Sequence, residues 1–239
     1  MPSVRTSPTA FSLTAGSRTA PASRPLSPFA ERLEAVRERI RSTGRDLEEI
    51  AIVAVSKGRS VVECREALSA GVHALGENRV QEALPKLEAL SEAEWHLVGH
   101  LQRNKVRQVS GRFRLIQSLD SVRLAEMLAD RDPGQAVLVE VNISREAAKQ
   151  GVRPEEVVAV TRQIGGLLAL EGLMGMGPLS GDPEPAFREL AELRLRCQDV
   201  TGRPLPILSM GMSGDFEAAC RAGSTMLRLG RVLFESPRA

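Results

Sequence analysis

Two patterns of apolar residues alternate along this chain. Short runs rich in Val, Ile and Leu are separated by longer segments in which apolar residues recur every three or four positions. The first pattern is typical of buried strands and the second of amphipathic helices. The helical spacing begins near Pro28, where Phe29, Leu33, Val36 and Ile40 lie between charged residues.

Eight segments have the length and composition of buried strands. They are residues 50–55, 72–75, 95–98, 115–117, 136–141, 168–173, 207–209 and 226–229. Helical segments are expected at 61–70, 80–90, 121–129, 155–164, 186–197 and 215–222. Strands that alternate with helices are parallel and joined by crossover connections. The sequence therefore predicts an α/β fold, a single (β/α)8 TIM-type barrel over residues 28–239, with an open doubly wound sheet as the alternative.

The first residues have a different composition. Twenty of the first thirty are Ser, Thr, Pro or Ala, and none is acidic. Such a segment buries too little apolar surface to order itself, so residues 1–27 are predicted to form a disordered tail. An organellar transit peptide or a misplaced start codon would explain the same letters.

Charge and cysteine content exclude several classes of function. The chain has 32 Lys and Arg against 30 Asp and Glu, so its net charge of +2 gives no support for nucleic acid as a partner. Its longest apolar run has six residues, too few to cross a membrane. The three cysteines form no C-x-x-C pair, which fits a reducing, cytoplasmic compartment. His96 and His100 lack a third metal ligand of suitable spacing, so no metal site is expected.

Functional residues of a (β/α)8 barrel lie at the carboxyl ends of the strands. The first strand ends in Lys57, where burial would lower the pKa of the amine and let it attack an aldehyde. The alternative is a lysine whose amine extends into water.

The loop after the seventh strand, 208–215, contains Ser213 and opens onto a helix, and Gly230 ends the eighth strand. Together they match the usual phosphate site of barrels, although a helix cap at Ser213 would give the same pattern. Arg228 of the eighth strand is expected to extend into the opening of the barrel at the carboxyl ends of the strands. A lysine, a phosphate cradle and an arginine describe a site for an aldehyde-bearing aromatic phosphate, and pyridoxal 5′-phosphate has all the required groups.

Motifs at successive strand ends resemble those of the YggS/PROSC family of pyridoxal-phosphate-binding proteins, also called the pyridoxal phosphate homeostasis proteins. The matching segments are 54–57, 75–78, 80–82, 95–105, 118–120, 142–146, 172–174, 208–219 and 222–230. The resemblance covers about residues 30–234 and implies a barrel like the N-terminal domain of alanine racemase.

The resemblance also implies roles for individual residues. Lys57 would carry pyridoxal 5′-phosphate as a Schiff base, and Arg228 would face the pyridine nitrogen. The phosphate would be held by Ser213, Thr225, Gly230 and nearby backbone. Asn78, Asn142 and Met210 would line the cofactor. Arg231 stands where the family often has a small hydroxyl residue, which would exchange a hydroxyl contact with phosphate for a charged one.

The implied function is intracellular homeostasis of pyridoxal 5′-phosphate without substantial catalysis. The protein would act as a monomer that holds the cofactor or passes it to PLP-dependent apoenzymes. The alternative is a PLP-dependent amino-acid racemase, but two-base racemisation needs an acid or base on each face, and the chain has no tyrosine. An arginine beside the pyridine nitrogen would also weaken the ring as an electron sink. A third possibility is an aldolase-type barrel that uses Lys57 without a cofactor.

Overall fold

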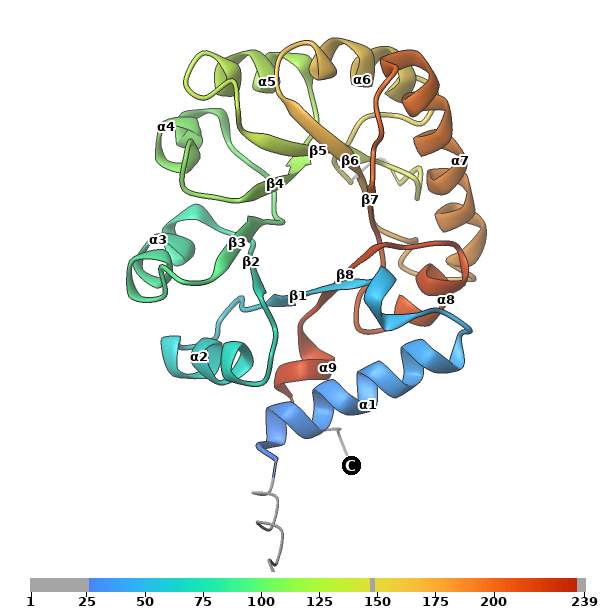
Figure 1. Cartoon of the computed structure of the whole chain (residues 1–239). Helices are drawn as coiled ribbons and strands as arrows, with labels where there is room; N and C mark the ends of the chain where they lie inside the picture. The colour runs from blue at the N-terminus through green and yellow to red at the C-terminus, as the bar shows by residue number, and fades with distance from the viewer. Residues whose placement is uncertain (1–25, 147–148, 236–239) are drawn as a thin grey trace, which may run out of the picture.

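Eight parallel strands form a closed barrel in the computed structural model, which describes residues 26–146 and 149–235 (Figure 1). Each strand pairs with the next, and the first pairs with the last. The predicted (β/α)8 barrel is confirmed and the open sheet is excluded. The strands are β1 Ala51–Val55, β2 Ala74–Glu77, β3 Glu94–Leu97, β4 Leu115–Leu119, β5 Ala136–Val141, β6 Ala169–Gly175, β7 Ile207–Ser209 and β8 Met226–Leu229.

Helices surround the barrel, as Figure 1 shows. The α-helices are α1 Pro28–Ser42, α2 Val61–Ser69, α3 Val80–Ala89, α4 Val106–Val109, α5 Val122–Ala129, α6 Val157–Gly165, α7 Glu184–Thr201, α8 Phe216–Arg221 and α9 Arg231–Phe234. Two 3-10 turns, η1 Leu47–Glu49 and η2 Arg103–Lys105, complete the described elements. Helix α1 begins at Pro28, as expected, because the Ser27 hydroxyl caps it by accepting the N–H of Ala30. The predicted tail lies outside the described residues, apart from its last two.

Three differences from the sequence-based expectation concern the site. Strand β2 extends to Glu77, beyond the expected end at residue 75, because a buried lysine neutralises that carboxylate. Strand β6 continues to Gly175, two residues beyond its expected end. The short helix α9 follows β8 directly and was not expected, since four residues carry too little periodicity to be recognised.

Apolar residues form two layers of core. One layer fills the barrel interior and includes Ala136 and Leu138 of β5 and Met226 of β8. The other lies between the strands and the helices and includes Val137 and Val139 of β5. Because side chains alternate across a strand, Glu140 follows Leu138 into the interior and Arg228 follows Met226. The barrel interior therefore changes from apolar to charged toward the carboxyl ends of β5 and β8.

Two further features of the described residues concern the sequence-based expectations. Cys64, Cys197 and Cys220 are free thiols, all buried. Within residues 26–146 and 149–235, no helix combines the length and apolar character that a membrane crossing requires.

Candidate functional site at the carboxyl ends of the strands

Lys57 lies in a tight turn directly after β1. The turn closes when the Arg59 N–H donates to the Ser56 carbonyl, 2.9 Å away, and Gly58 supplies a positive φ of 71°. The Lys57 side chain is exposed and contacts no acceptor or carboxylate of the described residues. The expectation that this amine is buried is therefore wrong, although its place at the end of β1 is confirmed.

The other three lysines are differently placed. Lys86 is buried in an ion pair, and Lys149 Nζ lies 2.9 Å from a Glu146 carboxylate oxygen. Lys105 is half-buried in η2. Lys57 is thus the lysine that directly follows a barrel strand, and its exposed side chain has no partner in the part of the chain that the structure describes.

The loop after β7 meets the first turn of α9. Ser213 Oγ accepts the N–H of Val232 at 3.2 Å, which leaves its own O–H free to donate. The backbone N–H groups of Ser213, Gly214 and Arg231 donate to no acceptor within the described part of the chain. Gly230 links β8 to this helix start. These N–H groups and the Ser213 hydroxyl form an anion cradle, a name used below for Ser213, Gly214 and Arg231.

Gly211 shapes the loop that carries Ser213. Its φ is +97°, and a Cβ at this position would lie 2.7 Å from Ala219 Cβ and 2.9 Å from Leu227 Cδ2. The loop is closed further along by Asp215, whose carboxylate accepts the N–H of Met212 at 2.6 Å. Close packing against α8 and β8 therefore holds the anion cradle in place.

Arg228 enters the barrel interior from β8 and is 5% exposed. Its Nη1 donates to Ser209 Oγ at 2.7 Å and its Nη2 to the Gly175 carbonyl at 3.0 Å. The Ser209 hydroxyl donates in turn to Gln117 Oε1 at 2.7 Å. The Gln117 amide nitrogen lies 2.9 Å from His96 Nδ1. A chain of hydrogen bonds therefore crosses the barrel interior and fixes the guanidinium.

Burial shifts the protonation equilibria of three interior groups. It lowers the pKa of Arg228 to about 10, against the effect of Glu140, so Arg228 remains a cation at neutral pH. It raises the pKa of Glu140 to about 7, against the attraction of Arg228. It lowers the pKa of His96 to about 4, so this imidazole is neutral and accepts the Gln117 amide N–H at Nδ1. The site thus combines one buried cation with one carboxyl group that titrates near neutrality.

Thr225 is not brought to this end of the barrel. It precedes β8, and its Oγ1 accepts the N–H of Leu208 at 2.8 Å and donates to the Pro206 carbonyl at 3.1 Å. These contacts lie at the amino ends of β7 and β8, whereas Gly230 lies at the carboxyl end. The expectation that Thr225 contacts the same phosphate as Gly230 is wrong, because a parallel strand separates the two residues by its full length.

Met210 and Asn142 are also turned to structural contacts. Met210 is 0% exposed and packs in the core between strands and helices. The Asn142 side-chain amide donates to the carbonyls of Glu146 and Lys149, at 3.0 and 3.2 Å, and so closes its own loop. Neither side chain is available to line a ligand in this arrangement.

Asn78 and Arg231 remain at the carboxyl ends of the strands. Asn78 is half-buried and directly follows β2. Arg231 is exposed and is the first residue of α9. Of the nine residues named from the sequence, the structure therefore places all but Thr225 at this end of the barrel, and Met210 and Asn142 are engaged there in structural contacts. The other six are Lys57, Asn78, Ser213, Arg228, Gly230 and Arg231.

Sequence reasoning missed the interior residues that support Arg228. Ser209, Gln117 and Glu140 are polar residues in strands, and only strand alternation would have indicated that they face inward. His96 was considered as a metal ligand, but its ring instead ends the hydrogen-bond chain. In the part of the chain that the structure describes, no three His, Cys, Asp or Glu side chains are grouped as a metal site requires.

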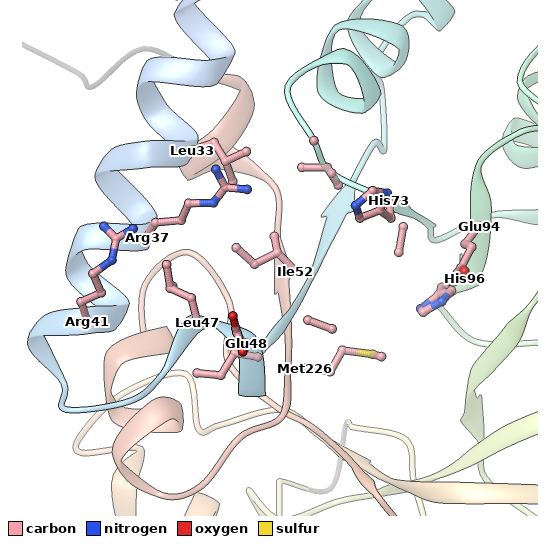
Figure 2. A pocket seen from close by; sticks show the side chains of 15 residues that line it. Leu33, Arg37, Arg41, Leu47, Glu48, Ile52, His73, Glu94, His96 and Met226 are labelled. Carbon is pink, nitrogen blue, oxygen red and sulfur yellow. The ribbon is translucent and has the colours of Figure 1, made fainter.

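A separate cavity of about 530 Å³ lies at the opposite end of the barrel (Figure 2). Its lining includes Ala51, Ala74, Glu94 and Met226, which are the first residues of β1, β2, β3 and β8. Arg37 and other residues of α1 form one wall. The cavity is therefore distinct from the site around Lys57, which lies at the carboxyl ends.

Comparison with known proteins places this site in a family. Residues 32–237 match the family described as alanine racemase, N-terminal domain. A pyridoxal phosphate homeostasis protein of Aquifex aeolicus is 41% identical over 220 residues, which span 85% of this chain and 96% of that protein. The protein of the same name from Escherichia coli is 34% identical over 226 residues, 87% of this chain and 97% of its own length.

Solved structures agree with the sequence relatives. PipY of Synechococcus elongatus, solved with PLP bound, has a TM-score of 0.76 and 31% identity, covering 86% of this chain and 99% of its own. Alanine racemase from Corynebacterium glutamicum has a TM-score of 0.73 at 15% identity, covering 90% of this chain and 62% of its own, a likeness of fold alone. On the fold, the strand-end residues and these relatives together, the chain belongs to the pyridoxal phosphate homeostasis protein family.

Proposed function

We propose that this protein binds pyridoxal 5′-phosphate at the carboxyl end of the barrel, with Lys57 as the covalent attachment point. The observation that carries the proposal is that Lys57 follows β1, Arg228 lies in β8, and the anion cradle joins the loop after β7 to the first residue of α9. Because β7, β8 and β1 are neighbours in the closed sheet, a free amine, a buried cation and N–H groups without a partner among the described residues come from adjacent strand ends. The names of the relatives and the PLP-bound PipY structure support the same ligand.

The donor groups fit the charge of the ligand. A phosphate dianion accepts several hydrogen bonds, and the N–H groups of Ser213, Gly214 and Arg231 have no partner within the described residues. The exposed Arg231 side chain adds a positive charge beside them. Arg228, held by Ser209, places its charge deeper in the barrel, where it suits a ring nitrogen that stays unprotonated.

The ligand supplies an aldehyde, which condenses reversibly with a primary amine as one water leaves. Lys57 provides that amine, and the anion cradle holds the phosphate in reach of it. Because the condensation is reversible, the protein is suited to keep the reactive aldehyde sequestered and to release it to apoenzymes. We infer that this holding and release is the function.

Substantial turnover of amino acids is not part of the proposal. Inversion at an α-carbon by two bases needs a group on each face of the ring, and the chain contains no tyrosine. Arg228 keeps its charge at neutral pH, and a cation beside the pyridine nitrogen disfavours the protonated ring that stabilises a carbanion. Both features support a carrier rather than a racemase.

The test is reduction with borohydride after incubation with pyridoxal 5′-phosphate, followed by peptide mapping. The label is expected on Lys57, and Lys57→Ala should abolish the visible absorbance of the bound ligand while far-UV circular dichroism is unchanged. Lys105→Ala is the matched control and should bind like the unaltered protein. A label on Lys105 or Lys149 in the unaltered protein would overturn the assignment of Lys57.

A further inference from the structure

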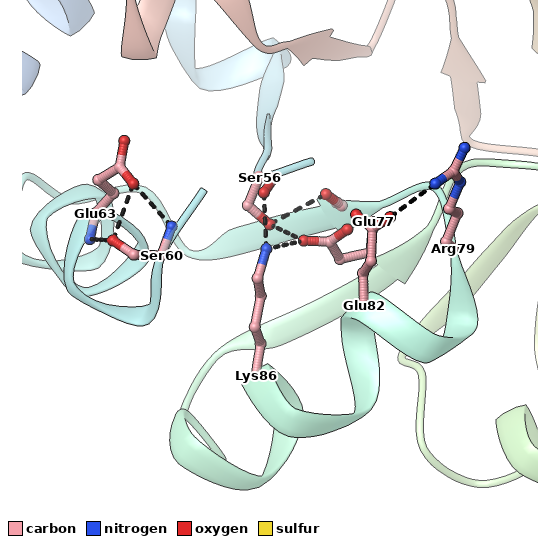
Figure 3. A network of polar contacts seen from close by, with 8 residues as sticks. Ser56, Ser60, Glu63, Glu77, Arg79, Glu82 and Lys86 are labelled. Atoms are coloured by element: carbon pink, nitrogen blue, oxygen red, sulfur yellow. Dashed lines mark hydrogen bonds and ion pairs between the residues drawn. The ribbon is translucent and has the colours of Figure 1, made fainter. Parts of the chain in front are cut away.

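A buried ion pair adjoins the turn that carries Lys57 (Figure 3). Lys86 Nζ of α3 lies 2.5 Å from Glu77 Oε1 of β2, and their side chains are 10% and 0% exposed. The same ammonium donates to the Ser56 carbonyl at 2.8 Å. The Ser56 hydroxyl donates to Glu77 Oε1 at 2.7 Å. The pair therefore holds the carbonyl and the hydroxyl of Ser56, the residue that precedes Lys57.

The far end of the turn is held as well. Ser60 caps α2, because its hydroxyl accepts the N–H of Glu63 while the Glu63 carboxylate accepts the N–H of Ser60 at 2.8 Å. Figure 3 shows both anchor points. Residues 56–60 are thus fixed at their two ends, with Lys57 and Gly58 between them.

Stability alone does not account for this arrangement. Glu77 Oε2 is buried and has no hydrogen-bond partner among the described residues, so the pair is only partly satisfied. A buried ion pair offers little net stability over apolar residues of the same volume. The contact that an apolar pair could not make is the one from Lys86 to the Ser56 carbonyl.

We propose that Lys86 and Glu77 are positioning residues for Lys57. They hold the Ser56 carbonyl so that the turn presents the Lys57 amine toward the anion cradle. Orientation of this kind raises the effective concentration of one reacting group at another. The inference rests on the proposed role of Lys57 and adds a reason why that amine is held in one place.

The test compares two ligands that differ at one group. Pyridoxamine 5′-phosphate has the ring and phosphate of pyridoxal 5′-phosphate but carries an amine in place of the aldehyde, so it forms no bond to Lys57. Lys86→Met should raise the Kd for pyridoxal 5′-phosphate about tenfold or more, on the scale of one lost charge-assisted hydrogen bond. The Kd for pyridoxamine 5′-phosphate should change less than about twofold, since the anion cradle is untouched.

A matched control lies on the same helix. Glu82 of α3 forms an ion pair with Arg79, whose side chain is 75% exposed, and exposed pairs contribute little (Figure 3). Glu82→Gln should leave both dissociation constants unchanged. An equal loss of affinity for both ligands in Lys86→Met would show a general packing effect and overturn the proposal, and so would no loss for either.

A second measurement needs no ligand. The Arg59 N–H donates to the same Ser56 carbonyl that Lys86 holds, so its hydrogen exchange reports the order of the turn. Exchange at Arg59 should be about tenfold faster in Lys86→Met than in the unaltered apoprotein. Unchanged exchange would overturn the positioning role. Faster exchange, with no borohydride label on Lys57 in the unaltered protein, would overturn the proposed function while showing that Lys86 orders the turn.

A double variant tests the proposal even if Lys86→Met alone fails to fold. Lys86→Met leaves the Glu77 carboxylate buried without its counter-charge, which is destabilising. The double variant Lys86→Met with Glu77→Gln carries no buried charge and still lacks the contact to Ser56. It should show the same selective loss for the aldehyde ligand and the same faster exchange at Arg59, and tight binding of both ligands with slow exchange would overturn the proposal.

Discussion

Replacement of Gly211 by alanine should destabilise the protein substantially. The residue has a φ of +97°, where a side chain costs about 1–2 kcal/mol. The new Cβ would also lie 2.7 Å from Ala219 Cβ and 3.1 Å from Phe216 Cα, so α8 would have to shift. Overpacking of this kind costs about 1–3 kcal/mol. The two effects together lower the free energy of unfolding by about 2–5 kcal/mol.

The assay is urea unfolding followed by the fluorescence of Trp95, the only tryptophan of the chain and 3% exposed. The matched control is Gly214→Ala in the same loop, where an added Cβ meets nothing within 4 Å. That variant should be unchanged or more stable by up to about 1 kcal/mol, because alanine restricts the unfolded chain. The midpoint should fall in Gly211→Ala without a change in the urea dependence.

The loss should extend to the ligand site. The Gly211 carbonyl accepts the backbone N–H of Arg228 in β8 at 3.0 Å. A shift of the loop would therefore disturb both the anion cradle and β8. A Gly211→Ala protein within about 0.5 kcal/mol of the unaltered one would show that the loop relaxes freely, and the claim that packing holds the anion cradle would then be refuted.

Four further predictions rest on the same structure. Ser213→Ala should weaken binding of pyridoxal 5′-phosphate about ten- to a hundredfold and of unphosphorylated pyridoxal much less, and equal weakening in a titration would place the phosphate elsewhere. Because burial raises the pKa of Glu140 to about 7, the free energy of unfolding decreases as pH rises from about 4.5 to 7. Glu140→Gln should make that decrease about 3 kcal/mol smaller, as measured by urea unfolding at several pH values. His96, whose pKa is lowered to about 4, has the opposite effect: the free energy of unfolding decreases as pH falls from about 6.5 to 4, so His96→Gln should reduce that decrease. If both variants changed the pH dependence in the same direction, these assignments would be contradicted. The protein loaded with pyridoxal 5′-phosphate and incubated with L- and D-alanine, serine and glutamate in deuterated water should not invert their α-carbons at a rate near one turnover per second. If inversion occurred at that rate and Lys57→Ala abolished it, the protein would be a racemase.

The barrel was predictable because the spacing of apolar residues is regular along the whole length of each strand and helix. Strands β5, β7 and β8 have the predicted limits, and every predicted helix is present. Strand β2 was misplaced because Gly76 and Glu77 have the composition of a turn. Only the contact with Lys86, nine residues further on, makes a buried carboxylate tolerable there.

The site was predictable where chain order and strand ends suffice. Lys57 and Gly230 each follow a strand, so their placement needs no side-chain geometry. Thr225 was misassigned although the predicted limits of β8 place it before that strand, because its role was taken from the family resemblance and not from its position in the barrel. Met210 was misassigned because side chains alternate along a strand: Ser209 faces the barrel interior, so the next residue faces the outer layer.

The pairing of β1 with β8 makes the site a product of barrel closure. Lys57 follows the first strand, whereas Gly230 and Arg231 follow the last, so more than 170 residues of chain separate the two halves of the proposed ligand site. A nascent or partly unfolded chain that lacks this final pairing cannot hold both ends of one ligand. Ligand binding as proposed is therefore coupled to this long-range pairing, and a saturating ligand would selectively stabilise the closed barrel over forms in which β1 and β8 are apart.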